Sequence, residues 1–290
     1  MNRHIVILGA GRPYRGELPS AVAGTPDHRR VLDWLLDAFK PLAPAQIAFV
    51  GGYRVDRVLS DYPQVKCVVN PEWEHTGAAA SLLSAPIEDG FELWGCYADV
   101  VFRPRAVEAL AATPGSAVLF DPAWRDRYAS RAAQDILSAG KILTDASGRL
   151  LGCSSALSPE AASGELAGLW KLDARAVQAL LAWRGSKSSE LARLTIPQLL
   201  EKLIAEGHAF TAVSGAGDWA ELNAPQDLAR FILGTKAETL ERLRPMVRRC
   251  AIGPSVAFEV GAWRTEPQAV IEKIRSVLGD QGALAVRSSA

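Results

Sequence analysis

The sequence predicts an α/β fold with a doubly wound, mostly parallel sheet, and three observations lead to this prediction. Short aliphatic runs alternate with amphipathic segments, which gives the order strand, helix, strand, helix, strand over residues 5–69. Several of these runs end in glycine or asparagine turns. The chain has 290 residues, of which 49% are hydrophobic, and this is enough to bury both faces of such a sheet.

The amino-terminal elements follow from apolar runs and their spacing. Val31, Leu35 and Phe39 recur every four residues and therefore form one apolar face of a helix over 29–40. Continuous aliphatic runs indicate buried strands, and a helix ending at residue 60 separates the second strand from the third. The expected strands span 5–8, 46–50 and 65–69.

The middle of the chain alternates in the same way and then changes character. Further elements, helix and strand in turn, are expected over 78–85, 91–97, 105–112 and 116–120. Short segments around Ile136, Ile142 and Leu150, divided by glycines, then predict an antiparallel meander against the parallel core. A strand returns over 165–172.

Helices dominate the next part of the domain. Thr195 and Gln198 stand three residues apart with Pro197 between them, which is the pattern of a capping box at the start of a helix. The remaining elements expected here are helices over 174–183 and 189–194, a strand over 210–213, and a strand that turns into a helix over 218–231.

We divide the chain into three parts. The α/β domain is expected over residues 1–234, and a linker helix over 235–254. The remainder is expected to form a small β-α-β appendage, with extended segments over 255–260 and 283–287 around a helix over 267–278.

Charge and cysteine content restrict the classes of partner and compartment. Lysine plus arginine and aspartate plus glutamate number 32 each, so we expect neither nucleic acid nor an anionic membrane as a partner. The four cysteines form no metal-binding or redox spacing, and we interpret them as packing thiols of a reducing compartment. No apolar run approaches membrane-spanning length and the start shows no signal-peptide pattern, so we expect a cytoplasmic protein.

The first predicted strand runs into a glycine turn that is suited to binding phosphate. Two glycines and an alanine lack the bulk that would keep a triphosphate away from backbone N–H groups, and two arginines follow. The residues assigned to this nucleotide cradle are Leu8, Gly9, Ala10, Gly11 and Arg12. A plain strand exit is the alternative, since no third glycine or GK[ST] completes a dinucleotide or P-loop pattern.

The stretch LGAGRPYRGELPS, residues 8–20, resembles a shortened form of the GxGxR…PK loop of nucleotidyltransferases that couple a nucleoside triphosphate to a phosphorylated acceptor. Within this group it is most similar to small cytidylyltransferases of the phosphocholine and phosphoglutamine kind. The resemblance implies a Rossmann-like sheet of the nucleotidyltransferase type and CTP as a substrate. The family's lysine after the proline is Ser20 here, so another residue would have to supply that cation.

The same resemblance implies a magnesium cofactor. Asp99 follows an apolar strand and resembles the aspartate that holds catalytic Mg²⁺ in this family. The stretch that begins at Glu221 resembles ExDTxxDL, which supplies the second metal oxygen, and the aligned residue is Asn223. Mg²⁺ takes one or two protein oxygens together with substrate phosphates, so Asp99 and Asn223 are the expected ligands. Helix capping or a turn is the alternative role of both residues.

Two further segments resemble the family's contacts to the nucleotide base. One is a glycine-tyrosine turn after the second strand, and the other has the pattern N-x₅-T-G followed by S-L. The residues expected to bind the nucleotide here are Gly52, Tyr53, Asn70, Thr76, Gly77 and Ser81. A helix beginning after Gly77 would offer free N–H groups. A tight strand-to-helix turn without ligand contacts is the alternative.

Acceptor binding is assigned to the charged and aromatic segment after residue 120 and to three neighbours. A lid of this composition would grip a phosphate and pack on a small organic group, and a solvated loop is the alternative. The assigned residues are Arg15, Trp124, Tyr128, Arg131, Lys141 and Glu165. Lys141 or Lys171 is expected to replace the missing loop lysine, and Lys171 is counted with Arg12 and Asp99 as catalytic.

The carboxyl end resembles a different family. The stretch AVRSSA, residues 285–290, looks like a strand near the start of the ATP-grasp domain of phosphoenolpyruvate synthases, in which the arginine at the place of Arg287 contacts a phosphate. Because the sequence stops there, we expect a truncated segment without kinase activity, which a kinase domain follows in the full-length protein.

Together these features predict Mg²⁺-dependent transfer of CMP from CTP to a phosphate or phosphonate oxygen of a small acceptor, with release of pyrophosphate. CTP and the acceptor are the expected partners. Two alternatives stay open. One is a sugar-1-phosphate nucleotidyltransferase, and the other is a catalytically dead domain that serves as a scaffold for a fused kinase.

Overall fold

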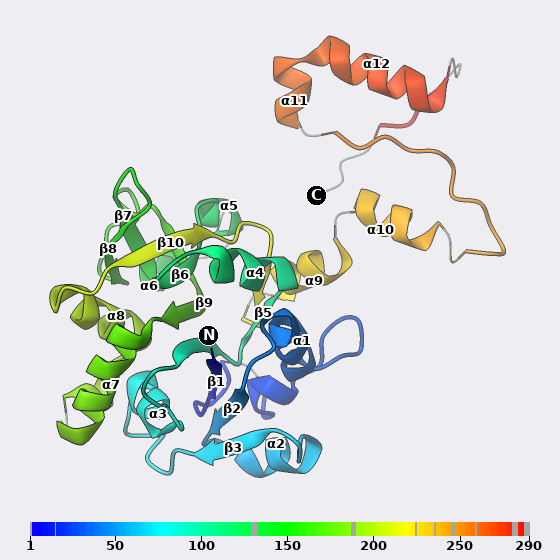
Figure 1. Ribbon diagram of the computed structural model, residues 1–290. Helices are drawn as coiled ribbons and strands as arrows, with labels where there is room; N and C mark the ends of the chain where they lie inside the picture. Colours follow the sequence, from blue (N-terminus) through cyan, green and yellow to red (C-terminus); the bar gives the residue numbers. More distant parts are fainter. Residues whose placement is uncertain are drawn as a thin grey trace. The chain divides into compact units, whose positions relative to one another are not determined.

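The computed structural model describes residues 2–14, 16–128, 133–186, 190–223, 225–234, 236–244, 247–258, 260–279 and 284–286. The chain divides into two compact units, Met1–Phe231 and Ile232–Ala290, and each is described by itself. Figure 1 shows that the first unit is a central sheet with helices on both sides. The predicted class, a doubly wound and mostly parallel sheet, is confirmed.

The centre of the sheet is β1 (Arg3–Gly9), and its neighbours run parallel to it. β2 (Gln46–Gly51) and β4 (Glu92–Tyr97) pair with β1, and β3 (Lys66–Val69) continues the sheet beyond β2. The middle of β1 is fully buried because both faces of the sheet are covered. Since these strands are parallel, their carboxyl ends share one edge, where sheets of this kind bind ligands.

The other half of the sheet contains a reversed strand. β9 (Gly164–Leu172) lies between β4 and β6 (Ser116–Asp121) and runs antiparallel to both, and β10 (Phe210–Ser214) pairs in parallel with β6. All of β9 is buried, so polar side chains on it need partners inside the protein. Its first residues lie at the edge where β1 and β4 end, and its last residues lie at the opposite edge.

Helices cover the two faces of this sheet. The helices described up to residue 233 are α1 (Val31–Phe39), α2 (Val55–Asp61), α3 (Ala78–Ser84), α4 (Pro104–Ala112), α5 (Trp124–Tyr128), α6 (Ala133–Ser138), α7 (Ala174–Ser186), α8 (Ile196–Ala205) and α9 (Pro225–Leu233). One continuous hydrophobic core joins α3, α7 and α8 to the sheet, and it includes Leu93 of β4. The next residue, Trp94, points to the other face, where Phe39 of α1 packs edge-on against it. Figure 1 shows α1 and α4 on the side of the sheet away from α7 and α8.

Two short strands form a separate small sheet beyond the carboxyl end of β4. β5 (Val100–Phe102) follows β4, and β11 (Trp219–Glu221) pairs with it in the antiparallel sense. This pairing returns a distant part of the chain to the end of β4. The expected strand-to-helix turn over 218–231 is therefore confirmed by β11 and α9.

The predicted meander is confirmed in two of its three segments. β7 (Lys141–Thr144) and β8 (Leu150–Ser154) form a hairpin that joins β9. The segment around Ile136 is helix α6 instead of a strand, so that part of the prediction is wrong. Lys141 supplies a physical reason, because its ammonium donates to the last carbonyl groups of this helix and stabilises its carboxyl end.

The second unit is helical in the described residues. Its helices are α10 (Lys236–Leu243), α11 (Val260–Thr265) and α12 (Pro267–Leu278). The helix expected over 267–278 is confirmed, but the extended β segments expected around it are wrong for the described residues 255–258 and 284–286, which pair with no strand. A strand needs a hydrogen-bonding partner, and the described part of this unit supplies none. Arg287 lies outside the described residues.

The cysteines of the first unit differ in burial from Cys250. Cys96 and Cys153 are buried, and burial raises the pKa of both thiols, that of Cys153 to about 12. Cys250 is exposed, which corrects the expectation that all four cysteines serve packing.

Among the described residues, no helix combines the length and the apolar content needed to cross a membrane.

Candidate active site

Asp99 stands at the carboxyl edge of the sheet, where the chain leaves β4. The Ala98 N–H donates to the Leu8 carbonyl at the end of β1 over 2.8 Å, and this bond holds the end of β4 beside the end of β1. β11 returns beside β5, and the Leu222 N–H donates to the Asp99 carbonyl, also over 2.8 Å. The strand topology therefore places Glu221, the last residue of β11, next to Asp99.

Asp99 and Glu221 form an acidic pair at this edge. Burial and the charge of Glu221 raise the pKa of Asp99 to about 6. A carboxyl group with a raised pKa at the carboxyl edge of a parallel sheet is a candidate functional group. Among the described residues Glu221, rather than the expected Asn223, lines the cavity beside Asp99. Asn223 lies exposed in the turn after β11, because the chain leaves the strand at Glu221.

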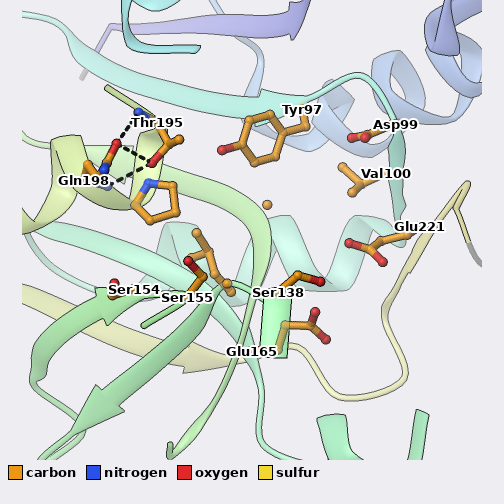
Figure 2. Close-up of a pocket in the computed structure, with 14 residues that line it drawn as sticks. Tyr97, Asp99, Val100, Ser138, Ser154, Ser155, Glu165, Thr195, Gln198 and Glu221 are labelled. Carbon is orange, nitrogen blue, oxygen red and sulfur yellow. Dashed lines mark hydrogen bonds between the residues drawn. The ribbon is translucent and has the colours of Figure 1, made fainter. Parts of the chain in front are cut away.

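A cavity of about 400 Å³ opens beside the acidic pair. Its charged lining groups are the carboxylates of Asp99, Glu165 and Glu221, and no described lysine or arginine lines it. Hydroxyl and amide groups make up most of its remaining polar lining, from Tyr97, Ser138, Ser154, Ser155, Thr195 and Gln198. Figure 2 shows Asp99 and Glu221 together on one side, and Thr195 and Gln198 on the opposite side. Such a lining suits a ligand that brings hydroxyl groups, a cation or a shared metal ion.

The acidic pair is suited to one kind of metal site. Within the described part of the chain, no group of three or more His, Cys, Asp or Glu side chains could hold a metal ion. Mg²⁺, however, is held in many enzymes by one or two carboxylates together with substrate phosphates. Asp99 and Glu221 therefore fit a Mg²⁺ ion that is shared with a phosphorylated ligand.

The segment expected to form an acceptor lid packs into the protein. Trp124 is fully buried and forms a small core with Tyr128, whose hydroxyl donates to Glu165 over 2.5 Å. The structure therefore contradicts the prediction that Trp124 and Tyr128 bind the acceptor, because both side chains are used to build the wall behind Glu165. Glu165 itself lines the cavity, and its role in binding the acceptor stays a prediction. Two residues of the same prediction lie outside the described residues, Arg15 and Arg131.

The turn after β1 is shaped by close contacts. A β-carbon on Gly9 would lie 2.5 Å from the Phe49 ring, so this glycine is required by packing, and Leu8 and Ala10 are buried. Gly11 faces open space, with no described atom within 4 Å of a β-carbon built on it. Gly11 and the exposed Arg12 are therefore the parts of the turn that a ligand can approach.

The second turn of the predicted nucleotide site docks on the first. The Tyr53 N–H donates to the Ala10 carbonyl over 2.8 Å, and Arg12 lies 5.6 Å from the centre of the Tyr53 ring. A β-carbon on Gly52 would lie 2.7 Å from the Ala10 carbonyl oxygen and 2.5 Å from Trp73. The structure thus brings Gly52 and Tyr53 to the cradle as predicted. It adds Trp73, which packs edge-on against Tyr53 and was not expected from the sequence.

Asn70, Thr76 and Ser81 lie together, and Asn70 is hydrogen-bonded to the other two side chains. The Asn70 amide donates to both hydroxyl oxygens over 3.0 Å, and its own oxygen accepts the Glu72 N–H. These bonds shape the segment between β3 and α3. Asn70 and Ser81 are buried and therefore serve the alternative role, that of a tight strand-to-helix turn without ligand contacts. Thr76 belongs to the same turn and is half-exposed.

The start of α3 is occupied by protein. The Gly77 N–H donates to the Ala192 carbonyl over 2.7 Å, and the Ala79 N–H to the Leu194 carbonyl over 3.1 Å. The accepting carbonyls belong to the 3₁₀ helix η3 (Leu191–Arg193) and to Leu194 directly after it, and η3 stands within the helix expected over 189–194. The structure therefore contradicts the expectation that Gly77 opens a helix with free N–H groups for a nucleotide.

Lys171 is not at the site. It is buried, and its ammonium bonds the Glu92 carboxylate at 3.1 Å and the Thr113 carbonyl, while Arg3 also binds Glu92 at 3.0 Å. Because β9 is antiparallel, Lys171 lies at the amino edge of β4, opposite to Asp99. The prediction that Lys171 is catalytic is therefore contradicted. The reversed direction of β9 was the fact that the sequence did not reveal.

Lys141 does not replace the loop lysine either. Its buried ammonium donates to the carbonyl groups of Ile136, Leu137 and Ala139. Burial lowers the pKa of Lys141, and the charge of nearby Glu165 acts in the opposite direction. Because this ammonium group is bonded at the end of α6, its predicted role in binding the acceptor is contradicted.

The fold described above is that of solved nucleotidyltransferase structures. One is the inositol-1-phosphate CTP transferase from T. maritima, with a TM-score of 0.61, 17% identity, and coverage of 83% of this chain and 97% of that chain. Another is the CTP:phosphocholine cytidylyltransferase from Streptococcus pneumoniae, with a TM-score of 0.58, 15% identity, and coverage of 79% and 97%.

A third similar structure uses a different nucleotide. It is a UDP-glucose pyrophosphorylase complexed with UDP-glucose, with a TM-score of 0.57, 12% identity, and coverage of 80% of this chain and 97% of that chain. No protein-family model and no curated protein sequence matches the chain. At these identities the likeness establishes the fold, and the chemistry must be argued from the site itself.

The two glycines of the cradle should respond differently to substitution. We expect Gly9→Ala to lower the free energy of unfolding by about 1–3 kcal/mol, because the new methyl group overlaps the Phe49 ring and Ala98. Gly11→Ala is the matched control and should change it by less than about 0.5 kcal/mol. Urea unfolding followed by tryptophan fluorescence measures both. Equal destabilisation by the two substitutions would contradict this description of the turn.

Proposed function

We propose that the chain is a Mg²⁺-dependent cytidylyltransferase, which moves CMP from CTP to a phosphate or phosphonate oxygen of a small acceptor and releases pyrophosphate. The observation that carries the proposal is the acidic pair of Asp99 and Glu221. This pair lines the cavity, and Asp99 follows Ala98, which is hydrogen-bonded to Leu8 of the nucleotide cradle. A reaction between two anionic groups needs positive charge between them, and this pair is positioned to hold a cation there.

Asp99 and Glu221 would hold the metal, in place of the pair Asp99 and Asn223 expected from the sequence. When bound, Mg²⁺ would neutralise charge on the transferred phosphoryl group and on the leaving pyrophosphate. The protein's own contribution is positional, since both substrates are brought to one edge of a rigid sheet so that the reacting atoms meet in line. Arg12 would add charge at the phosphates, and its exposure beside Gly11 supports this role.

CTP would occupy the cradle formed by the first two turns. The open backbone at Gly11 suits the triphosphate, and the aromatic corner of Tyr53 and Trp73 suits the base. Gly77 and Ser81 would act indirectly, since their bonds hold the wall of this cradle. Thr76, which is half-exposed, is the member of that segment with access to the nucleotide.

The cavity would hold the acceptor. Its carboxylates suit the cationic end of phosphocholine, of phosphoglutamine or of an aminoalkylphosphonate, while the acceptor's phosphate would share the metal ion. The hydroxyl and amide lining equally suits a sugar, so a sugar-1-phosphate nucleotidyltransferase is a second candidate. The solved structures with this fold include CTP-dependent transferases and a UDP-glucose enzyme.

Pyrophosphate release tests the proposal directly. The protein would be given CTP, UTP, dTTP or GTP with Mg²⁺, in combination with phosphocholine, phosphoglutamine, an aminoalkylphosphonate, inositol phosphate or glucose-1-phosphate. We expect release with CTP at least about tenfold faster than with the other nucleotides. A preference for UTP or dTTP with glucose-1-phosphate would favour the second candidate. No release and no nucleotide binding in any combination would favour the scaffold alternative.

The second unit is proposed to be dispensable for this reaction. The resemblance of residues 255–290 to a phosphoenolpyruvate synthase segment, and the fusion to a kinase that it implies, stay predictions, as does the cytoplasmic location. Deleting the residues after Gly234 should leave CTP-dependent pyrophosphate release within about threefold of the parent. Loss of release in a deletion variant that keeps its unfolding transition would show that the second unit completes the site.

A further inference from the structure

Within the part of the chain that the structure describes, three carboxylates surround Arg127 of α5, and two of them line the cavity. Its guanidinium nitrogens lie 3.5 Å from Glu165, 3.8 Å from Asp121 and 3.7 Å from Glu221. The side chain is 14% exposed, and the Glu165 and Asp121 side chains are almost fully buried. These acids come from β6, β9 and β11, so one cation joins three strands beneath the cavity.

An aromatic ring fixes the position of this guanidinium. Arg127 lies over the Trp219 ring, 3.9 Å from its centre, in a cation–π arrangement. The Trp219 indole N–H donates to Asp121 over 3.2 Å, so the ring is itself held in place. Trp219 and Glu221 both belong to β11, and Arg127 therefore contacts this strand at two points.

Glu221 is the link from this cluster to Asp99. It contacts Arg127 through Oε2, and it stands beside the Asp99 carboxyl at the edge of the cavity. Two neighbouring carboxylates repel each other, and an exposed glutamate would rotate away into solvent. The Arg127 guanidinium, which lies 3.7 Å from the Glu221 carboxylate and is held over Trp219, would restrain this rotation.

We propose that Arg127 is a positioning residue, which holds the Glu221 carboxylate beside Asp99 so that the pair is ready to bind a divalent cation. This inference rests on the proposed function, and it assigns a role that neither the motifs nor the resemblance supplied. Direct binding of the acceptor phosphate by Arg127 is the competing role. Its three carboxylate contacts and its absence from the described cavity lining argue against that role.

Replacing Arg127 with an uncharged residue distinguishes a positioning role from a purely electrostatic one, because the two roles change the metal affinity in opposite directions. Removing a positive charge near a cation site strengthens cation binding if charge is all that matters. Removing a positioning residue weakens it, because Glu221 is released. We therefore expect Arg127→Met to raise the dissociation constant for Mn²⁺, measured by electron paramagnetic resonance without nucleotide, at least about tenfold.

Two variants complete this experiment. Arg127→Lys keeps the charge but loses the planar fork, and should raise the same constant about threefold to tenfold. Arg125→Met is the matched control on the same helix. In the described structure Arg125 binds the Pro159 and Ala162 carbonyls and lies over the Trp124 ring, away from the acidic pair, so this variant should stay within twofold. If Arg127→Met unfolds, Arg127→Lys decides. Mn²⁺ binding that is unchanged or tighter in the deciding variant overturns the proposal.

A parallel measurement separates this inference from the proposed function. Asp99→Asn should abolish Mn²⁺ binding in the same assay, and if it does not, the metal site fails whatever Arg127 does. If Asp99→Asn abolishes binding and the deciding Arg127 variant leaves it intact, only the positioning role fails. In the transfer reaction, Arg127→Met should raise the Mg²⁺ concentration for half-maximal rate at least tenfold, while kcat at saturating Mg²⁺ stays within about fivefold.

Discussion

Asp99→Asn should lower kcat for CTP-dependent pyrophosphate release by about a thousandfold, even at saturating Mg²⁺. The carboxylate stands at the edge where β1 and β4 end, and it carries the charge that would hold the cation between the two substrates. A bound metal supplies several kcal/mol of stabilisation to the developing charge, and each 1.36 kcal/mol is a factor of ten in rate. Asparagine keeps the size of the side chain, so the loss would report on charge and not on folding.

Two further variants decide which residue completes the pair. Glu221→Gln should lower kcat by about a hundredfold, since it removes the second carboxylate of the acidic pair. Asn223→Ala should stay within threefold of the parent, because Asn223 is exposed in the turn after β11. Steady-state rates over a range of Mg²⁺ concentrations measure all three variants. A larger loss for Asn223→Ala than for Glu221→Gln would restore the pairing expected from the sequence.

The parts of the site that were predictable from the sequence are those that follow from local patterns. Asp99 follows an apolar strand, and the carboxyl ends of parallel strands meet at one edge, so its position follows from strand order alone. The cradle at Gly9–Gly11 and its neighbour Tyr53 follow in the same way. Each lies directly after a strand that the hydropathy pattern locates.

The parts that were not predictable depend on strand direction and on distant pairing. Lys171 and Glu165 lie on one strand, and only the reversed direction of β9 places Glu165 at the site and Lys171 at the far edge. Glu221 reaches Asp99 because β11 pairs with β5, a contact between segments far apart in the chain. Motif alignment compares residue types along the chain and therefore selected Asn223. It carries no information on where a strand ends, and β11 ends at Glu221, two residues earlier.

The lid prediction fails for an energetic reason. Trp124 and Tyr128 have a composition that suits ligand contact as well as it suits packing, and hydropathy does not separate the two. Burying both rings removes a large apolar area from water, and the Tyr128 hydroxyl finds Glu165 as a partner. The same aromatic residues therefore stabilise the wall of the cavity.

Lys171→Met should lower the free energy of unfolding by about 3 kcal/mol and leave the catalytic rate of the folded protein unchanged. Its partner Glu92 is buried, and removing one member of a buried ion pair costs about 3–5 kcal/mol because the other charge is left uncompensated. Arg3 stays bound to Glu92, which places the expected cost at the lower end of that range. Urea unfolding measures the loss.

Two further variants serve as controls for the effect of Lys171→Met on stability. Lys202→Met removes a half-exposed lysine paired with Glu206 and should cost less than about 1 kcal/mol. The double variant Glu92→Gln, Lys171→Met should recover part of the loss, because residue 92 no longer carries a buried charge and the Arg3 side chain is partly exposed to solvent. A fall in turnover at full folding would instead return Lys171 to the active site.

The pH dependence of the Lys171→Met deficit follows from Glu92. Burial alone would raise the pKa of Glu92, but hydrogen bonds from Trp94, Lys171 and Arg3 and the charge of Lys171 outweigh it, so its pKa lies below the usual 4.5. A depressed carboxyl pKa stabilises the fold above the unfolded value, and this contribution is lost as the pH falls through the folded value. The deficit should therefore be complete at neutral pH and shrink in acid, where Glu92 becomes protonated in both proteins. A deficit that is constant from pH 7 to about pH 3 would contradict a role for this ion pair and point to lost packing alone.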